Sequence, residues 1–333
     1  MATELTVLGG GAWGTALALH AARSGHAVRL WVHDPGRARD IAHLRENTTY
    51  LPGHMLSAEV QVVTELRTAL RGAREVLVAV PSHHCRTILG QARPDLEKDT
   101  IVCFASKGIE TTTLRRVSEV GAEVLGDRGR RAVLCGPSFA REVAEGHPTA
   151  VVVASEDPDA AARLQQRLSS GHLRAYTNDD MVGSELGGAL KNVIAVGAGV
   201  VEGLGYGANT MAALITRGLA EISRLAESLG GRRETLAGLA GLGDLVLTCT
   251  SPLSRNRTLG ALLGRGGTLE QFHAGTPHVA EGERTALSAR RLAQRQDVEM
   301  PITEQVHAVL HEGKPAREAI DELLARQLTR EWH

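Results

Sequence analysis

The sequence predicts an α/β protein in which a doubly wound, mainly parallel sheet precedes an all-α helical domain. Two observations lead to this fold class. Short apolar runs alternate with helical patterns as far as about residue 177, as in sheets that helices cover on both faces. From residue 184 onward the apolar residues recur at helical spacing, and no β-rich run follows. We therefore expect two domains, residues 1–183 and residues 184–333.

A glycine-rich turn follows the first expected strand, residues 5–8. Gly9 permits a tight turn, Gly11 lets the backbone approach a pyrophosphate, and Gly14 lets the next helix pack closely on the strand. The N-terminus of that helix offers unpaired N–H groups to phosphates. This arrangement predicts a dinucleotide-binding site of the Rossmann type, and a purely structural glycine turn is the alternative.

The second expected strand, residues 28–32, ends about twenty residues after the turn, where a dinucleotide fingerprint has its ribose-binding residue. His33 follows the strand and is placed to touch the adenosine ribose. Asp34, one position further on, would suit the free 2′-hydroxyl of NAD. Three nearby arginines could instead accept the 2′-phosphate of NADP: Arg29, Arg37 and Arg39. The choice between NAD and NADP is therefore open.

The other elements of the first domain follow in alternation. Helices are expected over residues 35–46, 66–70, 85–92, 112–125 and 159–168. Strands are expected over residues 60–63, 75–80, 100–105, 131–135, 149–154 and 173–177. Residues 47–53 are interpreted as a polar loop that closes over one end of the sheet.

The helix expected over residues 184–203 is apolar almost all round and should be buried, yet it contains Lys191 and Asn192. A buried lysine is costly unless it is paired, and burial lowers its pKa towards the range needed for proton transfer near neutrality. A structural salt bridge is the alternative. A further helix runs over residues 211–229, and Pro315 opens the last one. The apolar residues of that last helix are Ile320, Leu323, Leu324 and Leu328.

Ligands of open α/β sheets lie at the carboxyl ends of the strands, where further polar residues occur. Lys107 follows an apolar strand, although a solvated lysine in a loop is the simple alternative. Residues 135–140 turn from a strand into a helix that could bind an anion, or that Ser138 merely caps. In the second domain Asp244 ends a glycine-rich turn, and residues 254–257 open a helix with arginines beside its N-terminus, which suits phosphate.

Composition gives no indication of several other protein classes. The net charge of the 333 residues is −1, with both signs mixed, so no electrostatic signature of nucleic acid or anionic membrane binding is present. No signal-peptide pattern opens the chain, and no apolar run approaches ~20 residues. Four isolated cysteines lack zinc-ligand spacing, and His83 and His84 have no visible partner. We expect a cytoplasmic protein without metal, nucleic acid or membrane insertion, with His83 and His84 lining a pocket or the surface.

Nine motifs occur in order along the chain. They lie at residues 9–18 (GGGAWGTALA), 80–83, 106–108, 135–140, 186–194 (LGGALKNVI), 216–221, 241–248, 254–257 and 300–303. Together they resemble the bacterial-type NAD(P)-dependent glycerol-3-phosphate dehydrogenase family, from Val7 to about Arg326. Two positions depart from the usual pattern of that family. Gly10 stands where alanine is frequent, and Ala12 stands where serine often supplies a hydroxyl near the phosphates.

The resemblance implies reversible reduction of dihydroxyacetone phosphate to sn-glycerol 3-phosphate with NADH or NADPH, for glycerophospholipid synthesis. It implies that Lys191 transfers the proton and that Lys107 lies near it, so that each lysine disfavours the charged form of the other. The matching catalytic residues are Lys107, Lys191, Asn192, Asp244 and Thr248. The matching substrate contacts are Lys107, Gly136, Ser138, Lys191, Asp244, Ser254, Arg255 and Asn256. The matching cofactor contacts are Gly9, Gly11, Ala12, Trp13, Gly14, His33, Lys107, Ala140, Arg255, Val279 and Glu281.

Two other functions compete with this interpretation. A β-hydroxyacid dehydrogenase would share the sheet, the helical domain and the lysine, but a carboxylate substrate does not require the phosphate-binding residues 254–257. A protein that senses a dinucleotide without turnover would not need the buried Lys191. By analogy we also expect a homodimer through the helical domain, although the apolar helices there could complete a monomeric core.

Overall fold

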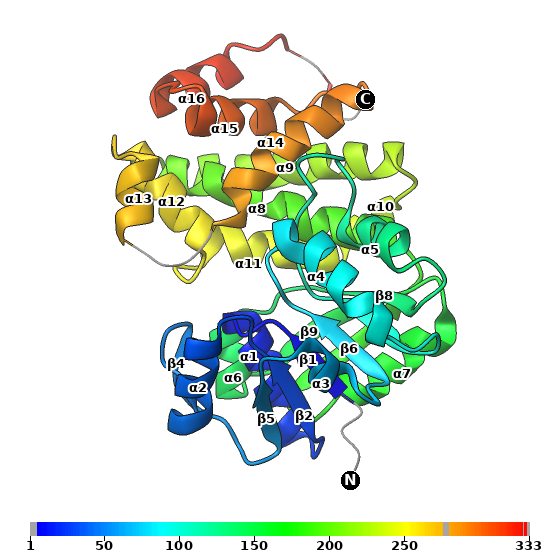
Figure 1. Cartoon of the computed structure of the whole chain (residues 1–333). Helices are drawn as coiled ribbons and strands as arrows, with labels where there is room; N and C mark the ends of the chain where they lie inside the picture. Colours follow the sequence, from blue (N-terminus) through cyan, green and yellow to red (C-terminus); the bar gives the residue numbers. More distant parts are fainter. Residues whose placement is uncertain (1–4, 276–279, 329, 332–333) are drawn as a thin grey trace.

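An eight-stranded sheet forms the N-terminal half of the molecule, and a group of helices packs on the carboxyl edge of that sheet (Figure 1). The computed structural model describes residues 5–275, 280–328 and 330–331. The strands lie in the order β10-β9-β8-β7-β6-β1-β2-β5. Their bounds are β1 Leu5–Leu8, β2 Val28–Trp31, β5 Val60–Val63, β6 Glu75–Val78, β7 Ile101–Phe104, β8 Arg130–Cys135, β9 Thr149–Ala154 and β10 Leu173–Asn178.

The strand order and direction confirm the predicted fold class. β5, β2, β1, β6, β7 and β8 run parallel, in the order of a dinucleotide-binding sheet. β9 runs antiparallel to β8, and β10 runs parallel to β9. α6 (Ala140–Glu145) lies in the connection from β8 to β9, and the chain comes directly back next to β8 as the antiparallel strand β9.

Helices cover both faces of the sheet because successive residues of a strand point to opposite sides. Leu77 of β6 packs on the side of α1, whereas Val76 and Val78 pack on the side of α4. The helices of this half are α1 Ala12–Arg23, α2 Pro35–Leu44, α3 Leu66–Leu70, α4 Cys85–Ala92, α5 Val117–Leu125, α6 and α7 Pro158–Leu168, with short turns η1 Ser82–His84 and η2 Arg93–Asp95.

Three details of the predicted elements are wrong. Residues 47–53 are no simple loop, because β3 (Glu46–Asn47) pairs with β4 (Leu51–Met55). α5 begins at Val117 rather than at residue 112, because the buried Leu114 has a φ of 61°, which a right-handed helix cannot contain. The last helix, α16 (Ala316–Leu324), ends before Leu328, which is exposed. Ala319 is the one buried residue of α16, so a longer helix would gain little from the burial of apolar side chains.

α8 (Met181–Gly203) is the central helix of the second half, and every residue from Gly183 to Val201 is buried, as its apolar sequence predicts. The helices around it are α9 Ala208–Ser228, α10 Arg233–Ala237, the π-helical turn η3 Leu239–Gly243, α11 Asp244–Thr250, α12 Arg255–Gly264, α13 Leu269–Gly275, α14 Glu281–Arg295, α15 Pro301–His311 and α16. The backbones of α8 and α12 are in contact, since a Cβ on Gly260 would lie 1.9 Å from the oxygen of Val196.

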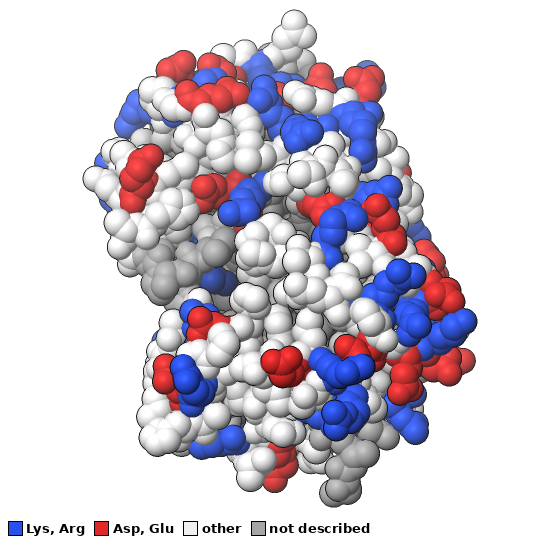
Figure 2. All heavy atoms as spheres, in the orientation of Figure 1, with Lys and Arg blue, Asp and Glu red and all other residues white. Residues whose placement is uncertain are grey.

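The surface charges and the cysteines are arranged as the sequence predicts. On the face shown in Figure 2, acidic and basic side chains are interspersed over both halves. All four cysteines are buried and unpaired. Within the described ranges, none of the helices has both the length and the apolar character that crossing a membrane demands.

Candidate active site

Two lysines from different halves of the chain meet at one buried carboxylate. Asp244, fully buried at the start of α11, accepts a hydrogen bond from Nζ of Lys107 at 2.7 Å and another from Nζ of Lys191. Lys107 follows β7, and Lys191 lies in the middle of α8. The side chain of Lys107 is 16% exposed, so it is not the solvated loop lysine of the simple alternative. Lys191 does form a salt bridge, but it shares its partner with a second cation.

The two lysines differ in pKa. Burial, together with the charge of Lys107, lowers the pKa of Lys191 to about 8, although Asp244 acts in the opposite direction. Burial also favours the neutral form of Lys107, but the Asp244 carboxylate outweighs it and raises the pKa of Lys107. The expectation that each lysine disfavours the charged form of the other is therefore wrong for Lys107. Lys107 stays a cation at neutral pH, and Lys191 is the group that can exchange a proton.

Thr248 and Asn192 lie beside the lysines. Nζ of Lys191 donates to Oγ1 of Thr248 at 2.9 Å, and that hydroxyl donates to the backbone oxygen of Asp244 at 2.6 Å. Nδ2 of Asn256 donates to Oδ1 of Asn192 at 2.9 Å, and Oδ1 of Asn256 accepts from a backbone N–H in the first turn of α14 at 2.9 Å. These bonds hold the two amides and the hydroxyl in place around the lysine pair.

The glycine turn between β1 and α1 has the predicted shape. Gly9 has a φ of 128°, and a Cβ on Gly14 would lie 1.9 Å from the oxygen of Gly9. A Cβ on Gly11 would meet no atom within 4 Å, so this side of the turn is open. Gly11 is also the N-cap of α1 and has no side chain, which leaves the first N–H groups available. Nε1 of Trp13 is buried without a partner in the described part of the chain. The turn therefore fits a dinucleotide pyrophosphate.

Gly136 and Ser138 lie in the turn after β8. Gly136 has a φ of 115°, and its oxygen accepts hydrogen bonds from Nζ of Lys107 at 3.4 Å and from Oγ of Ser138 at 3.0 Å. The N-cap of α6 is Phe139, and Ala140 is the first residue of that helix. The alternative that Ser138 caps the helix is therefore wrong.

The remaining site residues of the second half surround the N-termini of α12 and α14. Ser254 caps α12, as predicted, by accepting a hydrogen bond from a backbone N–H at 3.2 Å. Arg255, the first residue of α12, is exposed. Glu281 opens α14 and accepts a hydrogen bond from Oγ of Ser82 at 3.2 Å, which joins the two halves; burial raises the pKa of Glu281. Val279 lies outside the described residues.

Several residues predicted near the adenosine ribose make contacts within the protein itself. His33 is exposed after β2, and Asp34 caps α2 by accepting a hydrogen bond from the backbone of Arg37 at 2.6 Å. Arg29 is bonded to the carbonyl oxygens of residues 69 and 71. The guanidinium of Arg37 lies 4.7 Å from the ring centre of Tyr50. The arrangement leaves the choice between NAD and NADP open.

The rings of His83 and His84 lie next to each other after β6, with centres 4.1 Å apart and planes inclined at 46°. Burial lowers the pKa of His83 to about 4, so this ring is neutral at physiological pH, and His84 is exposed. His83 therefore contributes no charged acid to the lysine pair.

A buried asparagine that sequence reasoning missed supports the glycine turn. Nδ2 of Asn47 donates to the oxygen of Gly10 at 2.9 Å and to Oγ1 of Thr15 at 2.8 Å, and Oδ1 accepts from the backbone of Tyr50 at 3.2 Å. Asn47 is fully buried. Because its neighbours in sequence are polar, no local pattern distinguishes it from a loop residue.

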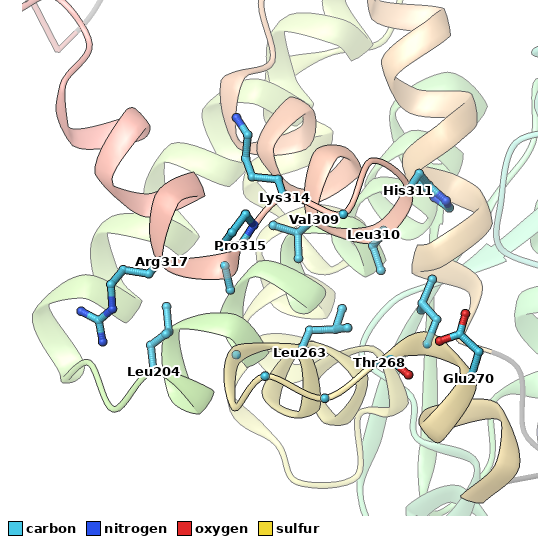
Figure 3. A pocket seen from close by; sticks show the side chains of 16 residues that line it. Leu204, Leu263, Thr268, Glu270, Val309, Leu310, His311, Lys314, Pro315 and Arg317 are labelled. Atoms are coloured by element: carbon cyan, nitrogen blue, oxygen red, sulfur yellow. The ribbon is translucent and has the colours of Figure 1, made fainter.

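One surface cavity lies away from the predicted site residues. A cavity of about 530 Å³ lies between the ends of α8 and α12 and the last two helices (Figure 3). Its apolar wall includes Leu204, Leu263, Val309, Leu310 and Pro315. Lys314 points away from the cavity and donates to Gln305 and Glu322. No predicted site residue lines this cavity, and the described residues hold no cluster of side chains suited to a metal ion.

Comparison with known proteins gives the family. A model described as the NAD-dependent glycerol-3-phosphate dehydrogenase N-terminus matches residues 4–161, and one described as the C-terminus matches residues 180–321. The glycerol-3-phosphate dehydrogenases (NAD(P)+) of Koribacter versatilis and Geobacter sulfurreducens are each 50% identical over 333 residues, covering 99% of both chains. A crystal structure of glycerol-3-phosphate dehydrogenase from Coxiella burnetii, 41% identical, has a TM-score of 0.94 and covers 97% of this chain and 98% of that one. The chain belongs to the NAD-dependent glycerol-3-phosphate dehydrogenase family.

Proposed function

We propose that this protein catalyses the reversible reduction of dihydroxyacetone phosphate to sn-glycerol 3-phosphate with NADH or NADPH. The observation that carries the proposal is a lysine at the centre of a buried helix, with a pKa of about 8, beside a second lysine that stays charged. Such a group donates and accepts protons near neutral pH. The substrate class comes from the names of relatives that are 50% identical over the whole chain.

In this mechanism each polar residue of the cluster has a distinct role. Lys191 stabilises the developing alkoxide and protonates it, and in the oxidation direction the neutral lysine takes the proton back. Lys107, kept charged by Asp244, adds a second positive group near the carbonyl oxygen. Thr248 and Asp244 hold Nζ of Lys191 in place. The nicotinamide cofactor, when bound at the glycine turn, supplies the hydride.

The phosphate of the substrate is assigned to the N-terminus of α12. Ser254, Arg255 and Asn256 lie there, where the first N–H groups of the helix and a guanidinium favour an anion. Asn256 is bonded to Asn192, the neighbour of Lys191 in α8, so the phosphate end and the proton donor belong to one connected group. Holding the phosphate orients the ketone towards the reacting groups.

The domain division, the assembly and the location are proposed with the reaction. We assign residues 1–183 to a dinucleotide-binding domain and residues 184–333 to a helical domain with the substrate and catalytic residues, which is supported by the last strand ending at Asn178 and α8 beginning at Met181. We also propose a homodimer through the helical domain, in the cytoplasm, whose product serves glycerophospholipid synthesis. Sedimentation equilibrium tests the dimer, and a monomer at every concentration would contradict it. Cell fractionation tests the location.

The decisive experiment follows the absorbance of NADPH, and separately of NADH, with dihydroxyacetone phosphate. Lys191→Ala and Lys191→Met should lose turnover and keep cofactor binding, measured by nucleotide fluorescence. Lys98→Ala, which removes an exposed lysine far from α8, is the matched control and should behave as wild type. If wild-type protein binds the cofactor but oxidises neither form with this ketone, the assignment fails and a dinucleotide-sensing role takes its place.

A further inference from the structure

We propose that Glu185 is a positioning residue for Lys107, acting through Arg116 and Ser118; this role rests on the proposed function. Glu185 precedes Lys191 on α8 by less than two turns. The partners of its carboxylate belong to the sheet half, so it joins the helix of the proton donor to the chain that carries the second lysine.

Lys107 begins a connection between β7 and α5, residues 107–116, that we name the lysine segment. Two apolar residues of this segment pack on the helical half. Ile109 and Leu114 are buried in the apolar cluster of α8 and α14. The buried hydroxyl of Ser288 in α14 donates to the oxygen of Ile109 at 3.0 Å, and Arg291 donates to another carbonyl of the segment at 2.7 Å. The helical half therefore holds the segment from Ile109 onward, while Gly108 lies against Ser82 of the sheet half.

Glu185 fixes the far end of the lysine segment. Its buried carboxylate accepts hydrogen bonds from Nη1 of Arg116 at 2.6 Å, from the backbone N–H of Ser118 at 2.8 Å and from the hydroxyl of Ser118. At the near end, Lys107 is bonded through Asp244 to Lys191. The segment is thus bonded to α8 directly at its far end and through Asp244 of α11 at its near end, and these bonds place Lys107 relative to Lys191.

Because Glu185 is buried, losing its ion pair with Arg116 should disturb the structure around it. Burial raises the pKa of Glu185, while Arg116 and the bonds from Ser118 favour its charged form. Arg116→Met would leave the buried Glu185 carboxylate without its cation, and Glu185→Gln would leave Arg116 with only the more exposed Glu119 at 3.2 Å, so the chain around the pair must rearrange. Because its partners are Arg116 and Ser118, Glu185 touches no reacting group and acts only by placing the segment.

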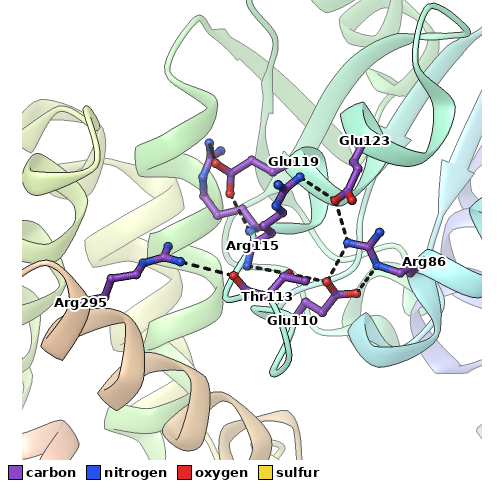
Figure 4. A network of polar contacts seen from close by, with 8 residues as sticks. Arg86, Glu110, Thr113, Arg115, Glu119, Glu123 and Arg295 are labelled. Carbon is purple, nitrogen blue, oxygen red and sulfur yellow. Dashed lines mark hydrogen bonds and ion pairs between the residues drawn. The ribbon is translucent and has the colours of Figure 1, made fainter.

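A second network holds the same segment from the sheet side and offers a rival explanation (Figure 4). Arg86 of α4 donates to both oxygens of Glu110 at 2.8 and 2.9 Å, and to Glu123 of α5 at 2.9 Å. This network is more exposed than the Glu185 pair, since the side chains of Arg86, Glu110 and Glu123 are 34%, 13% and 44% exposed, against 14% and 6% for Arg116 and Glu185. Exposed pairs are screened and contribute little. Glu110→Gln should therefore affect catalysis less than Glu185→Gln.

The test compares Glu185→Gln, Arg116→Met and the double variant. Each single change should lower kcat/KM for dihydroxyacetone phosphate by about 10- to 100-fold, and the double variant should fall no further, because both act on one pair. The Kd of NADPH should change by less than about twofold, since the glycine turn is untouched. The pH midpoint of kcat should also move, because the pKa of Lys191 depends on the position of Lys107.

Asp157→Asn is the matched control, because it breaks a two-bond pair with Arg130 at the start of α7, away from the site. It should lower Tm and leave kcat unchanged. A Glu185→Gln protein with lower Tm but normal kcat and pH midpoint would show a merely structural role and overturn the proposal, as would a larger effect of Glu110→Gln.

If Glu185→Gln does not fold, Arg116→Met alone provides the kinetic test of the same ion pair, and normal kinetics there would overturn the proposal. Wild-type protein without turnover would refute the proposed function itself, whereas an active wild type with unaffected variants would refute only the role of Glu185.

Discussion

Because Lys191 titrates near pH 8, the two directions of the reaction should depend on pH in opposite ways. Reduction needs the protonated lysine, so its kcat should fall as the pH rises through about 8. Oxidation needs the neutral lysine, so its kcat should rise through the same midpoint. Initial rates in both directions, over roughly two pH units on each side, measure this. Profiles that move in the same direction would contradict the assignment of Lys191 as the proton-transferring group.

Asn47 should control cofactor affinity without taking part in the chemistry. Asn47→Ala removes the bonds to Gly10 and Thr15, and the turn loses a support worth about 1 kcal/mol or more, so the Kd of NADPH should rise about fivefold or more. At saturating cofactor, kcat should stay normal. Thr48→Ala, at the exposed neighbouring position, is the control. An unchanged Kd in Asn47→Ala would show that the turn keeps its shape without this support.

The sequence predicts the charged centre of the site better than its supports. Lys191 is recognisable because a lysine interrupts an otherwise apolar helix, and Asp244 because a carboxylate follows a glycine-rich turn. Asn47 and Glu185 are not recognisable, since their partners lie far away in sequence and a pattern of burial does not show which polar groups face each other. The raised pKa of Lys107 is missed for the same reason, because it depends on sharing Asp244.

At the scale of helices, Glu221 of α9 should make stability depend on pH. Its carboxylate accepts hydrogen bonds from the backbone N–H groups of Ile302 and Thr303 at the start of α15, at 2.6 and 3.2 Å. Burial raises the pKa of Glu221 to about 7, so between its ordinary value and 7 the folded protein binds more protons than the unfolded chain. The contribution of Glu221 to stability should therefore decline as the pH rises through that window.

Glu221→Gln cannot titrate and removes this dependence. The difference in Tm between wild type and Glu221→Gln should shift against wild type as the pH rises towards 7, while Arg224, whose charge favours the ionised form of Glu221, is the same in both. A difference that stays constant with pH would mean that Glu221 does not change its protonation in this window.

The contact between α8 and α12 should tolerate no side chain. A methyl group on Gly260 would lie 1.9 Å from the oxygen of Val196, so Gly260→Ala must push the two helices apart at a cost of about 1–3 kcal/mol. Denaturant unfolding measures this. Gly275→Ala is the control, since an added Cβ there meets no atom within 4 Å. Equal stability of the two variants would contradict the close packing.

Elements with continuous apolar runs are predicted well, and those that depend on distant partners are not. β6, β7 and β8 are recognisable because buried parallel strands are apolar on both faces. The antiparallel direction of β9 shows only in its pairing with β8, and β3 exists because it pairs with β4. Neither property can be derived from local spacing.

The whole molecule should unfold in a single transition despite its two domains. Ile109 and Leu114 of the lysine segment are buried among the helices, and Ala240 of η3 is buried against Val133 and Cys135 of β8, so each half completes the core of the other. Calorimetry should therefore give one unfolding transition. NADPH should raise the Tm of that whole transition, because it binds the folded state. Two transitions, of which only the first responds to NADPH, would contradict this coupling.

One carboxylate shared by two ammonium groups ties ligand exchange to a proton. With both lysines protonated, the group of Lys107, Asp244 and Lys191 has a surplus of positive charge, and after Lys191 gives up its proton it is neutral. A phosphate ester is an anion, so the attraction that draws the ketone in is weaker when the alcohol has formed. We expect the product to leave while Lys191 is neutral. Lys191 then takes a proton from water, which restores the positive charge of the site before the next molecule binds.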